Sequence, residues 1–538
     1  MSKHAKEDDP GQVERADRVQ IRQLPTGVAG LDEILGGGLP EYSFNIIAGA
    51  PGSGKTTLTH QLMFANATPE QPALYFTVLG EPAIKMLRYQ QQFTFFDQSK
   101  LDGAIRFVNL SQLVLDQDLG AVLDAIIKEV EESSAKIVVV DSFRTVVRKA
   151  LAAASEIELQ GFVQRLALHL TSWQATTFLI GEYVEGELRD NPVFTVADGL
   201  FWLYQSVERN SIVRKMQVMK LRGQETVPGL HTFRITEHGM QTFPRTFGLT
   251  DNKSEHVKGR RRLSSGVGEL DALMGGGIPE GDSLLVAGPS GAGKTVLGIQ
   301  FIAEGLRQGE PGIVAMFEER PNEFLLRAAS FGYDLNKNLK DGSLKLIYLR
   351  PLDLSVDETV HEIVSAVKEI GCKRLVIDSL VGFEMALAPD FRTDFRESLY
   401  RMIGALTRLG VTILSTVEVE ENFTSMGLSN FTISFLADDI LRLRYASING
   451  QLRKMMMVVK MRRSQHSIDM CSYEVTSTGL AIGGPMRGYQ ALTSGIPSPW
   501  SVESEQNHPE LRATADPVPQ KQPRPGARKS GKRGRKNQ

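Results

Sequence analysis

The chain alternates short runs of β-branched and aliphatic residues with longer stretches whose apolar positions recur at helical spacing. In the C-terminal half the short runs predict five strands: Ser283–Ala287, Gly312–Phe317, Leu344–Tyr348, Arg374–Ile377 and Val411–Thr416. The stretches between them predict four helices: Thr295–Arg307, Asn322–Ala329, Thr359–Ile370 and Asp394–Arg408. Such alternation is typical of an α/β fold, in which helices cover both faces of a mostly parallel sheet.

The same pattern occurs once more, earlier in the chain. There the predicted strands are Ser43–Ala48, Ala73–Val78, Ile105–Asn109, Lys136–Val140 and Thr177–Gly181. Leu24–Pro40 aligns without a gap on Leu263–Pro279, which lies 239 residues further on. An offset that stays nearly constant over a whole α/β pattern indicates a duplicated domain rather than a short recurring motif.

Polar and low-complexity segments set the expected domain bounds. We expect a disordered lead over residues 1–17, a first domain over 18–247, a linker over 248–260, a second domain over 261–485 and a disordered basic tail over 486–538. The linker is mostly polar and charged. The tail is rich in Ser, Pro, Gln, Lys and Arg, a composition that disfavours a packed core.

Overall composition narrows the class of protein. Hydrophobic residues make up 41% and charged residues 23%, which is ordinary for a globular protein. The formal net charge of −2 favours neither nucleic acid nor membrane, although the last 18 residues hold eight Lys or Arg and no acid. Two distant cysteines, a polar N-terminus and the lack of a long apolar run predict a cytoplasmic protein without disulfides, a structural zinc or a membrane span.

Each copy contains the phosphate-loop pattern G-x-x-x-x-G-K-[ST] between a predicted strand and a predicted helix. Glycines let successive backbone N–H groups turn toward phosphate oxygens, and the helix N-terminus favours the anion. ATP is therefore expected at both copies. The expected ATP-binding residues are Gly49, Ala50, Pro51, Gly52, Ser53, Gly54, Lys55, Thr56 and Thr57 in the first, and Gly288, Pro289, Ser290, Gly291, Ala292, Gly293, Lys294, Thr295 and Val296 in the second.

A nucleotide of this kind carries Mg²⁺, for which the loop threonines Thr56 and Thr295 supply hydroxyl ligands. A carboxylate at the end of a hydrophobic strand completes such a site, and Asp141 and Asp378 occupy that position in the two copies. A strand-end Asp can also cap the following helix. The phosphate loop upstream of each makes Mg²⁺ the better interpretation.

A pair of carboxylates distinguishes the two copies. After its second strand the second copy reads Phe-Glu318-Glu319, whereas the first copy has Leu79 and Gly80 there, followed by Glu81. ATP hydrolysis needs a carboxylate that orients water near the γ-phosphate. Lys294 would reach the β- and γ-phosphates. A solvated turn is the alternative interpretation of the glutamates. We expect the first site to bind ATP with slow turnover and the second to hydrolyse it.

These motifs resemble those of the KaiC family, the double-domain members of the RecA-type ATPases, over about residues 18–485. The resemblance rests on the Gly-Leu-Asp…Gly-Gly-Gly…Pro lead-in, both phosphate loops, the Glu318–Glu319 pair and two late motifs, Lys220-Leu-Arg-Gly and Lys460-Met-Arg. It implies two tandem RecA-like P-loop domains in a two-tiered ring, expected to be a hexamer of identical chains, with ATP and Mg²⁺ held between neighbouring subunits. KaiB-like or other signalling proteins would be its partners.

The resemblance also implies roles for residues that spacing alone does not assign. Lys220 and Arg222, and likewise Lys460 and Arg462, would reach the γ-phosphate bound by the adjacent subunit. A basic strand edge that prevents unwanted pairing is the alternative.

Serine/threonine autokinase activity is a further implication of the resemblance. Ser434 stands at the family's serine acceptor position, whereas Phe435 replaces the threonine; Thr432 and Ser429 lie nearby. Ser434 can equally be a small hydrogen-bonded residue of a buried strand.

Two other classes of function remain open. The first is a nucleotide-gated scaffold that signals through partner docking, which Leu79 and Gly80 favour for the first copy. The second is a RecA-type DNA motor, for which no DNA-contacting module is evident in the sequence. Weak docking of nucleic acid or an acidic partner to the basic tail is an alternative to a merely solvated end.

Overall fold

The computed structural model describes most of both domains. Its described residues are 21–78, 83–116, 119–146, 156–183, 193–208, 211–245, 261–349, 355–386, 395–419, 437–462, 464–490, 492 and 497–499. The predicted lead and linker lie outside these ranges.

The first domain is built on a nine-stranded sheet in the order β11-β10-β9-β8-β3-β7-β6-β4-β5. Its parallel strands are β3 (Phe44–Gly49), β4 (Ala73–Thr77), β5 (Ile105–Asn109), β6 (Ile137–Asp141), β7 (Thr176–Gly181) and β8 (Gly199–Glu208). An antiparallel extension follows, formed by β9 (Ser211–Leu221), β10 (Leu230–Thr236) and β11 (Gly239–Phe243). A small hairpin of β1 (Gln23–Leu24) and β2 (Leu39–Pro40) precedes the sheet.

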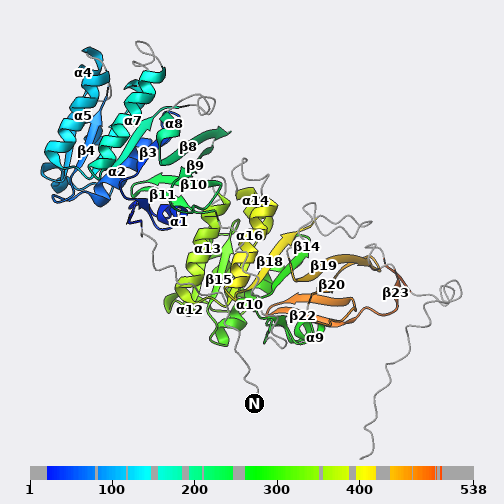
Figure 1. The fold of residues 1–538 in the computed structure, drawn as a ribbon. Coiled ribbons are helices and arrows are strands. Elements are labelled where there is room, and N and C mark those ends of the chain that lie inside the picture. The colour runs from blue at the N-terminus through cyan, green and yellow to red at the C-terminus, as the bar shows by residue number, and fades with distance from the viewer. Residues whose placement is uncertain are drawn as a thin grey trace, which may run out of the picture.

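Helices cover both faces of this sheet because its central strands are apolar on both sides (Figure 1). Adjacent residues of β3 belong to different cores: Ile46 packs in one cluster and Ile47 in the other. The helices are α1 (Leu31–Leu35), α2 (Lys55–Asn66), α3 (Ala83–Gln90), α4 (Ser111–Asp116), α5 (Leu119–Ser133), α7 (Glu156–Ser172) and α8 (Val193–Val196).

The second domain repeats this architecture strand for strand, in the order β22-β21-β20-β19-β14-β18-β17-β15-β16. Its strands are β12 (Arg262–Leu263), β13 (Ile278–Pro279), β14 (Ser283–Gly288), β15 (Gly312–Met316), β16 (Leu344–Tyr348), β17 (Arg374–Asp378), β18 (Thr412–Glu418), β19 (Asp439–Ile448), β20 (Gln451–Met461), β21 (Cys471–Thr476) and β22 (Gly479–Pro485). Its helices are α9 (Gly268–Leu273), α10 (Lys294–Arg307), α11 (Pro321–Ser330), α12 (Asn336–Lys340), α13 (Val356–Ile370), α14 (Leu380–Ala386) and α16 (Phe395–Arg408).

The predicted α/β class and the tandem arrangement are confirmed, and the ten predicted strands are observed with ends that differ by at most two residues. The antiparallel part of each sheet was not among those strands. Long hairpins such as β19–β20 mix charged and apolar residues, so they do not show the short β-branched and aliphatic runs that predicted the other strands. These hairpins extend the central sheet on the far side of β3 and β14.

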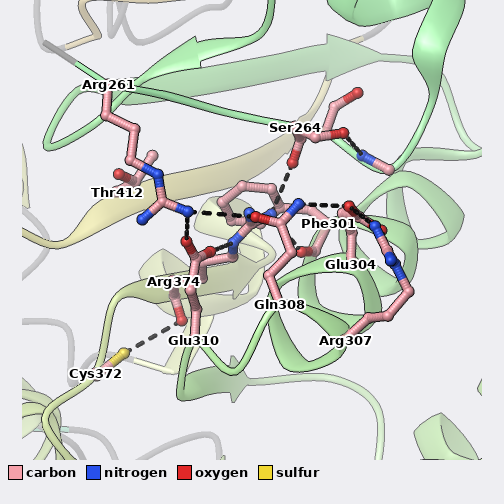
Figure 2. Close-up of polar contacts among 12 residues, drawn as sticks. Arg261, Ser264, Phe301, Glu304, Arg307, Gln308, Glu310, Cys372, Arg374 and Thr412 are labelled. Atoms are coloured by element: carbon pink, nitrogen blue, oxygen red, sulfur yellow. Dashed lines mark hydrogen bonds and ion pairs between the residues drawn. The ribbon is translucent and has the colours of Figure 1, made fainter.

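A buried arginine joins several elements at the amino ends of the second sheet (Figure 2). The Arg374 side chain is fully buried at the start of β17, and its Nε donates to Glu310 Oε2 at 2.7 Å. Its Nη1 donates to the carbonyls of Ser264 and Phe301, at 2.7 and 2.9 Å. Its guanidinium also lies over the Phe301 ring, 4.7 Å from the centroid. Glu310 is further paired with Arg261 at 2.6 Å.

The two domains contact each other through the antiparallel edge of the first sheet. Arg234 on β10 pairs with Glu358 on α13 at 2.7 Å, and Arg245 pairs with Glu397 on α16 at 2.8 Å. The Phe243 ring lies 5.7 Å from that of His361 on α13.

Ordered chain continues past residue 485. Strand β23 (Tyr489–Gln490) pairs with β24 (Ser498–Pro499), and Met486, Tyr489 and Leu492 pack against the β19–β20 hairpin. The tail predicted over 486–538 thus begins with residues that have apolar partners, and the basic run from Lys521 lies outside the described residues. Among the helices that the structure describes, none has both the length and the apolar character needed to cross a membrane.

Candidate nucleotide-binding sites

The two phosphate loops lie at the carboxyl ends of the central strands β3 and β14, and each leads directly into a helix, α2 or α10. The last glycine of each loop has a left-handed backbone, with φ of 99° at Gly54 and 95° at Gly293. A Cβ at Gly54 would come 2.7 Å from Ile235 Cδ1. Both conformation and space therefore require glycine here.

The loops fit a phosphate group. Neither α2 nor α10 has a side-chain cap at its N-terminus, so first-turn N–H groups are free of competing side chains. In the first loop the Ser53 hydroxyl is buried and makes no hydrogen bond within the described residues. In the second loop, the hydroxyls of Tyr445 and Tyr473 donate to the carbonyls of Ser290 and Ala292, at 3.2 and 2.6 Å. These donors hold the second loop in shape.

The loop lysines lie inside their own loops. Lys55 Nζ donates to the carbonyls of Gly49 and Ala50 at 3.0 and 2.8 Å, and Lys294 Nζ makes the equivalent bonds in the second domain. Burial lowers the pKa of Lys55 and of Lys294 from the ordinary value, and neighbouring carboxylates act in the opposite direction. A buried cation surrounded by carbonyls is suited to an anionic ligand such as a polyphosphate.

Asp141 lies close to the first loop, as its predicted role requires. Its Oδ2 accepts hydrogen bonds from the Thr56 hydroxyl at 3.0 Å and from the Tyr75 hydroxyl at 2.6 Å. Burial raises the pKa of Asp141, while the two hydroxyl donors and Lys55 lower it. Burial also raises the pKa of Tyr75 well above its usual range, so this side chain acts as a donor. The structure thus brings the Thr56 hydroxyl and the Asp141 carboxylate, two oxygen groups of the kind that Mg²⁺ prefers, into direct contact.

Asp378 has the same position at the end of β17, with a different hydroxyl donor. Its Oδ1 accepts a short hydrogen bond from Thr416 on the neighbouring strand β18. Its charge also acts on Lys294. Together with Thr295, the second residue of α10, Asp378 provides oxygen groups of the kind that Mg²⁺ prefers.

The structure separates the two glutamates that the sequence presents as a pair. Glu318 Oε1 accepts a hydrogen bond from Ser379, the residue after Asp378, at 2.8 Å, and its charge acts on Lys294. Glu319 instead pairs with Arg327 on α11, with Oε1 at 3.0 Å from Nε and 2.9 Å from Nη2. Glu318 is therefore the glutamate whose charge acts on the loop lysine, whereas Glu319 is held by α11, although the charge of Asp378 also acts on it. Burial raises the pKa of Glu319, against the effect of Arg327.

The late basic residues lie at the opposite end of the sheet from their own loops. Lys220 is opposite Leu200, whose partner is Ile46 in β3, three residues before Gly49. Lys220 is thus two strands to the side of β3 and, at about 3.3 Å per residue, roughly 10 Å back along the strand direction from the start of the loop in its own chain. Lys220 Nζ donates to the Thr195 carbonyl at 3.2 Å, and Arg222 pairs with Asp198 at 3.1 Å.

The second domain repeats this arrangement of late cations. Lys460 Nζ donates to the Ala437 carbonyl at 2.7 Å, and Arg462 Nη1 lies 3.5 Å from Asp438 Oδ1. Burial lowers the pKa of Lys220 and of Lys460, and the adjacent arginine acts in the same direction. Within one chain these cations do not meet the phosphate loop of the same domain.

Two carboxylates near the loop lysines were missed in the sequence. Glu182 follows β7 and Glu418 ends β18, where it is the strand partner of Gly288. Their charges act on Lys55 and Lys294 respectively. The sequence contains a signal for them, because the two glutamates stand at equivalent positions at the carboxyl end of the same strand of the repeat. Leu79, Gly80 and Glu81, and the Ser429–Phe435 segment with Ser434 and Thr432, lie outside the described residues.

Comparison with known proteins agrees with this geometry. A family model described as an ATPase, KaiC, matches residues 24–246 and again residues 263–486. The circadian clock oscillator protein KaiC 1 of Synechocystis is 29% identical over 499 residues, covering 91% of this chain and 94% of the relative. The circadian clock oscillator protein KaiC of Picosynechococcus is 28% identical over 494 residues, with 90% and 94% covered. The chain therefore belongs to the KaiC family of ATPases and carries that family's domain twice.

Proposed function

We propose that this chain is a Mg²⁺-dependent ATPase that assembles into a ring of identical subunits and acts in regulation. The second site is its main hydrolytic centre, and the first site binds ATP chiefly to support assembly. The observation that carries this proposal is the position of Glu318, which Ser379 holds beside Asp378 and toward Lys294. The names of the relatives, circadian clock oscillator proteins, support a regulatory role.

The residues of the second site divide the work of hydrolysis. Backbone N–H groups of the loop and Lys294 bind the phosphates, while Thr295 and Asp378 would hold the Mg²⁺ ion, which would supply positive charge to offset that of the phosphates. Glu318 accepts a proton from the water that attacks the γ-phosphate. Lys460 and Arg462 approach from the neighbouring subunit, because their position far from the loop of their own chain suits a contact in trans.

Hydrolysis is tested by exchanging the two glutamates separately. Glu318→Gln removes the proton acceptor and should lower kcat about 100-fold or more. Glu319→Gln is the matched control: it weakens the ion pair with Arg327 and should change kcat only a few-fold. Phosphate release under saturating ATP and Mg²⁺ gives both rates. Equal losses in the two variants, or full activity of Glu318→Gln, would contradict the assignment.

Assembly is tested at the first loop. Lys55→Ala should weaken ATP-dependent assembly, seen by light scattering with size-exclusion chromatography, while turnover per assembled second site persists. The alternative function, a nucleotide-gated scaffold, predicts that assembly depends on ATP binding alone and that Glu318→Gln leaves signalling unchanged. A RecA-type DNA motor would instead show ATP turnover that DNA stimulates. This stimulation should persist when the basic tail is truncated at Lys521.

Autokinase activity at Ser434 is the finer part of the proposal. The second site would transfer the γ-phosphoryl group of ATP to the Ser434 hydroxyl of a neighbouring subunit, with Glu318 accepting the hydroxyl proton and ADP leaving. Mass spectrometry of the peptide with Ser429, Thr432 and Ser434 after incubation with ATP tests it. An unmodified peptide would exclude the activity.

A further inference from the structure

Asp141 and Asp378 are equivalent aspartates of the two domains, and each accepts a hydrogen bond from a hydroxyl group on a neighbouring strand. The neighbouring strand that supplies this hydroxyl differs between the domains. In the first sheet, β6 lies between β4 and β7, and in the second, β17 lies between β15 and β18. Asp141 receives its hydroxyl from Tyr75 on β4, whereas Asp378 receives it from Thr416 on β18. Each domain has an apolar residue where the other has its hydroxyl donor.

The register of the strands makes this exchange explicit. Ile180 on β7 is the strand partner of Asp141, and Thr416 stands at the same place beside Asp378 because Ser415 is the partner of Ile377. On the other side, Tyr75 precedes Thr77, the partner of Asp141, by two residues. The equivalent residue in the second domain is Val314, which precedes Met316, the partner of Asp378.

The surroundings of Tyr75 are built for an aromatic ring. Its ring centroid lies 4.7 Å from that of His60 on α2 and 5.3 Å from that of Phe107 on β5. Tyr75 and His60 are both fully buried. The equivalent positions of the second domain hold the aliphatic residues Ile299 and Leu346, which leave no aromatic pocket beside Val314. A phenol two residues back along the strand can thus reach the carboxylate that a short threonine reaches from directly across.

We propose that Tyr75 is a positioning residue for the first nucleotide site, which holds Asp141 in the orientation needed for Mg²⁺ in place of the threonine used by the second site. Tyr75 and Thr56 donate to the same oxygen, Oδ2, so together they restrain the Asp141 carboxylate, which would serve the ion. Hydrogen-bond partners of groups that serve a metal ion tune its affinity. This inference rests on the proposed binding of Mg²⁺ and ATP at the first site.

The test uses full-length protein in which Lys294→Ala has silenced the second loop. Mg²⁺ is titrated at a fixed concentration of a fluorescent ATP analogue, and the readout is probe binding rather than hydrolysis. Tyr75→Phe should raise the Mg²⁺ concentration for half-maximal binding about tenfold. Tyr89→Phe, at an exposed tyrosine of α3, is the matched control and should leave this concentration unchanged.

A rescue experiment separates positioning from simple stabilisation. Ile180→Thr, added to Tyr75→Phe, introduces the hydroxyl that the second domain uses and should return the Mg²⁺ dependence most of the way to the parent value. Thermal unfolding without Mg²⁺ and nucleotide measures folding alone. If Tyr75 only stabilised the core, the two changes would add, because each removes a favourable buried interaction.

The outcomes are distinguishable. An unchanged Mg²⁺ dependence in Tyr75→Phe, or a double variant worse than the single one, overturns the inference while the first nucleotide site stands. If the parent background binds the probe without any dependence on Mg²⁺, the proposed magnesium site of the first domain is wrong, and the role of Tyr75 is lost with it.

Discussion

Asp439 shows how a single ionisable residue can make stability depend on pH. Its side chain begins β19 and is 1% exposed, and neither carboxylate oxygen has a side-chain partner within the described residues. Burial raises its pKa to about 7, and the nearby charges of Asp282 and Asp438 act in the same direction. The folded protein therefore holds this proton more tightly than the unfolded chain, whose Asp has a pKa of about 3.9.

The sign follows from this difference. Asp439 favours the folded state fully below about pH 4, and that contribution is lost as the pH rises through about 7. Asp439→Asn should therefore be more stable than the parent at pH 8, on the order of 4 kcal/mol, and equal to it below pH 4. Thermal unfolding across this range measures the difference. Asp124→Asn, at an exposed position of α5, is the control and should show no such trend; a constant difference for Asp439→Asn would contradict the prediction.

Residue types and spacing singled out the phosphate loops and the two strand-end aspartates, because each of these motifs is local in sequence, whereas the roles expected of the late cations came only from the family resemblance. The functions of the two glutamates were not separable in this way. Glu318 and Glu319 are adjacent, yet one contacts Ser379 from another strand and the other contacts Arg327 from a helix. The hydroxyl of Tyr75 was hidden for the same reason, since its partner Asp141 is 66 residues away.

At the scale of elements, Arg374 joins strand β17 to α10 and to the segment after β12. The fold of the second domain uses this cation where the first domain, at the equivalent position, has Ile137. Its partner Glu310 correspondingly aligns with Gln71. The second domain thus has a buried ion pair where the first has an apolar residue and an exposed amide, a difference that strand prediction from the sequence did not anticipate.

This comparison gives a test of the ion pair. Arg374→Ala leaves Glu310 buried with only the partly exposed Arg261 as its partner, so it should lower the free energy of unfolding by about 3 to 5 kcal/mol. Arg374→Ile with Glu310→Gln restores the pair of residue types found in the first domain and should recover much of that loss. Urea denaturation measures both variants. A double variant as unstable as Arg374→Ala would show that the two junctions are not interchangeable.

At the scale of the whole molecule, the contacts between domains connect the two nucleotide sites. Ile235 of β10 and Met240 of β11 lie against Gly54 of the first loop. Arg234, the residue before Ile235, pairs with Glu358 of α13 in the second domain. Helix α13 in turn packs in the core that contains Phe317, the residue before Glu318. A shift of the first loop can thus reach the second site through packed elements.

The proposed ring makes a prediction that only mixed assemblies can test. If Arg462 acts on the neighbouring subunit, Arg462→Ala and Glu318→Gln proteins should each be nearly inactive but should regain activity when mixed. In a random equal mixture about one quarter of the second sites join an intact Glu318 to an intact neighbouring Arg462. The mixture should therefore reach about a quarter of the parent rate. No recovery after subunit exchange, verified by fluorescence transfer between labelled chains, would place Arg462 in its own site.

The hydroxyl exchange around Asp141 also limits the order in which the two halves could have diverged after duplication. If Tyr75 holds Asp141, a threonine beside it could be replaced by Ile180 without losing the first site only once the tyrosine was in place. The reverse order passes through a chain with neither donor. A sequence comparison of the Ile180 position alone would therefore suggest that the first site has lost a residue it needs. A comparison of the Ile180 and Tyr75 positions together would show that one hydroxyl donor replaced another.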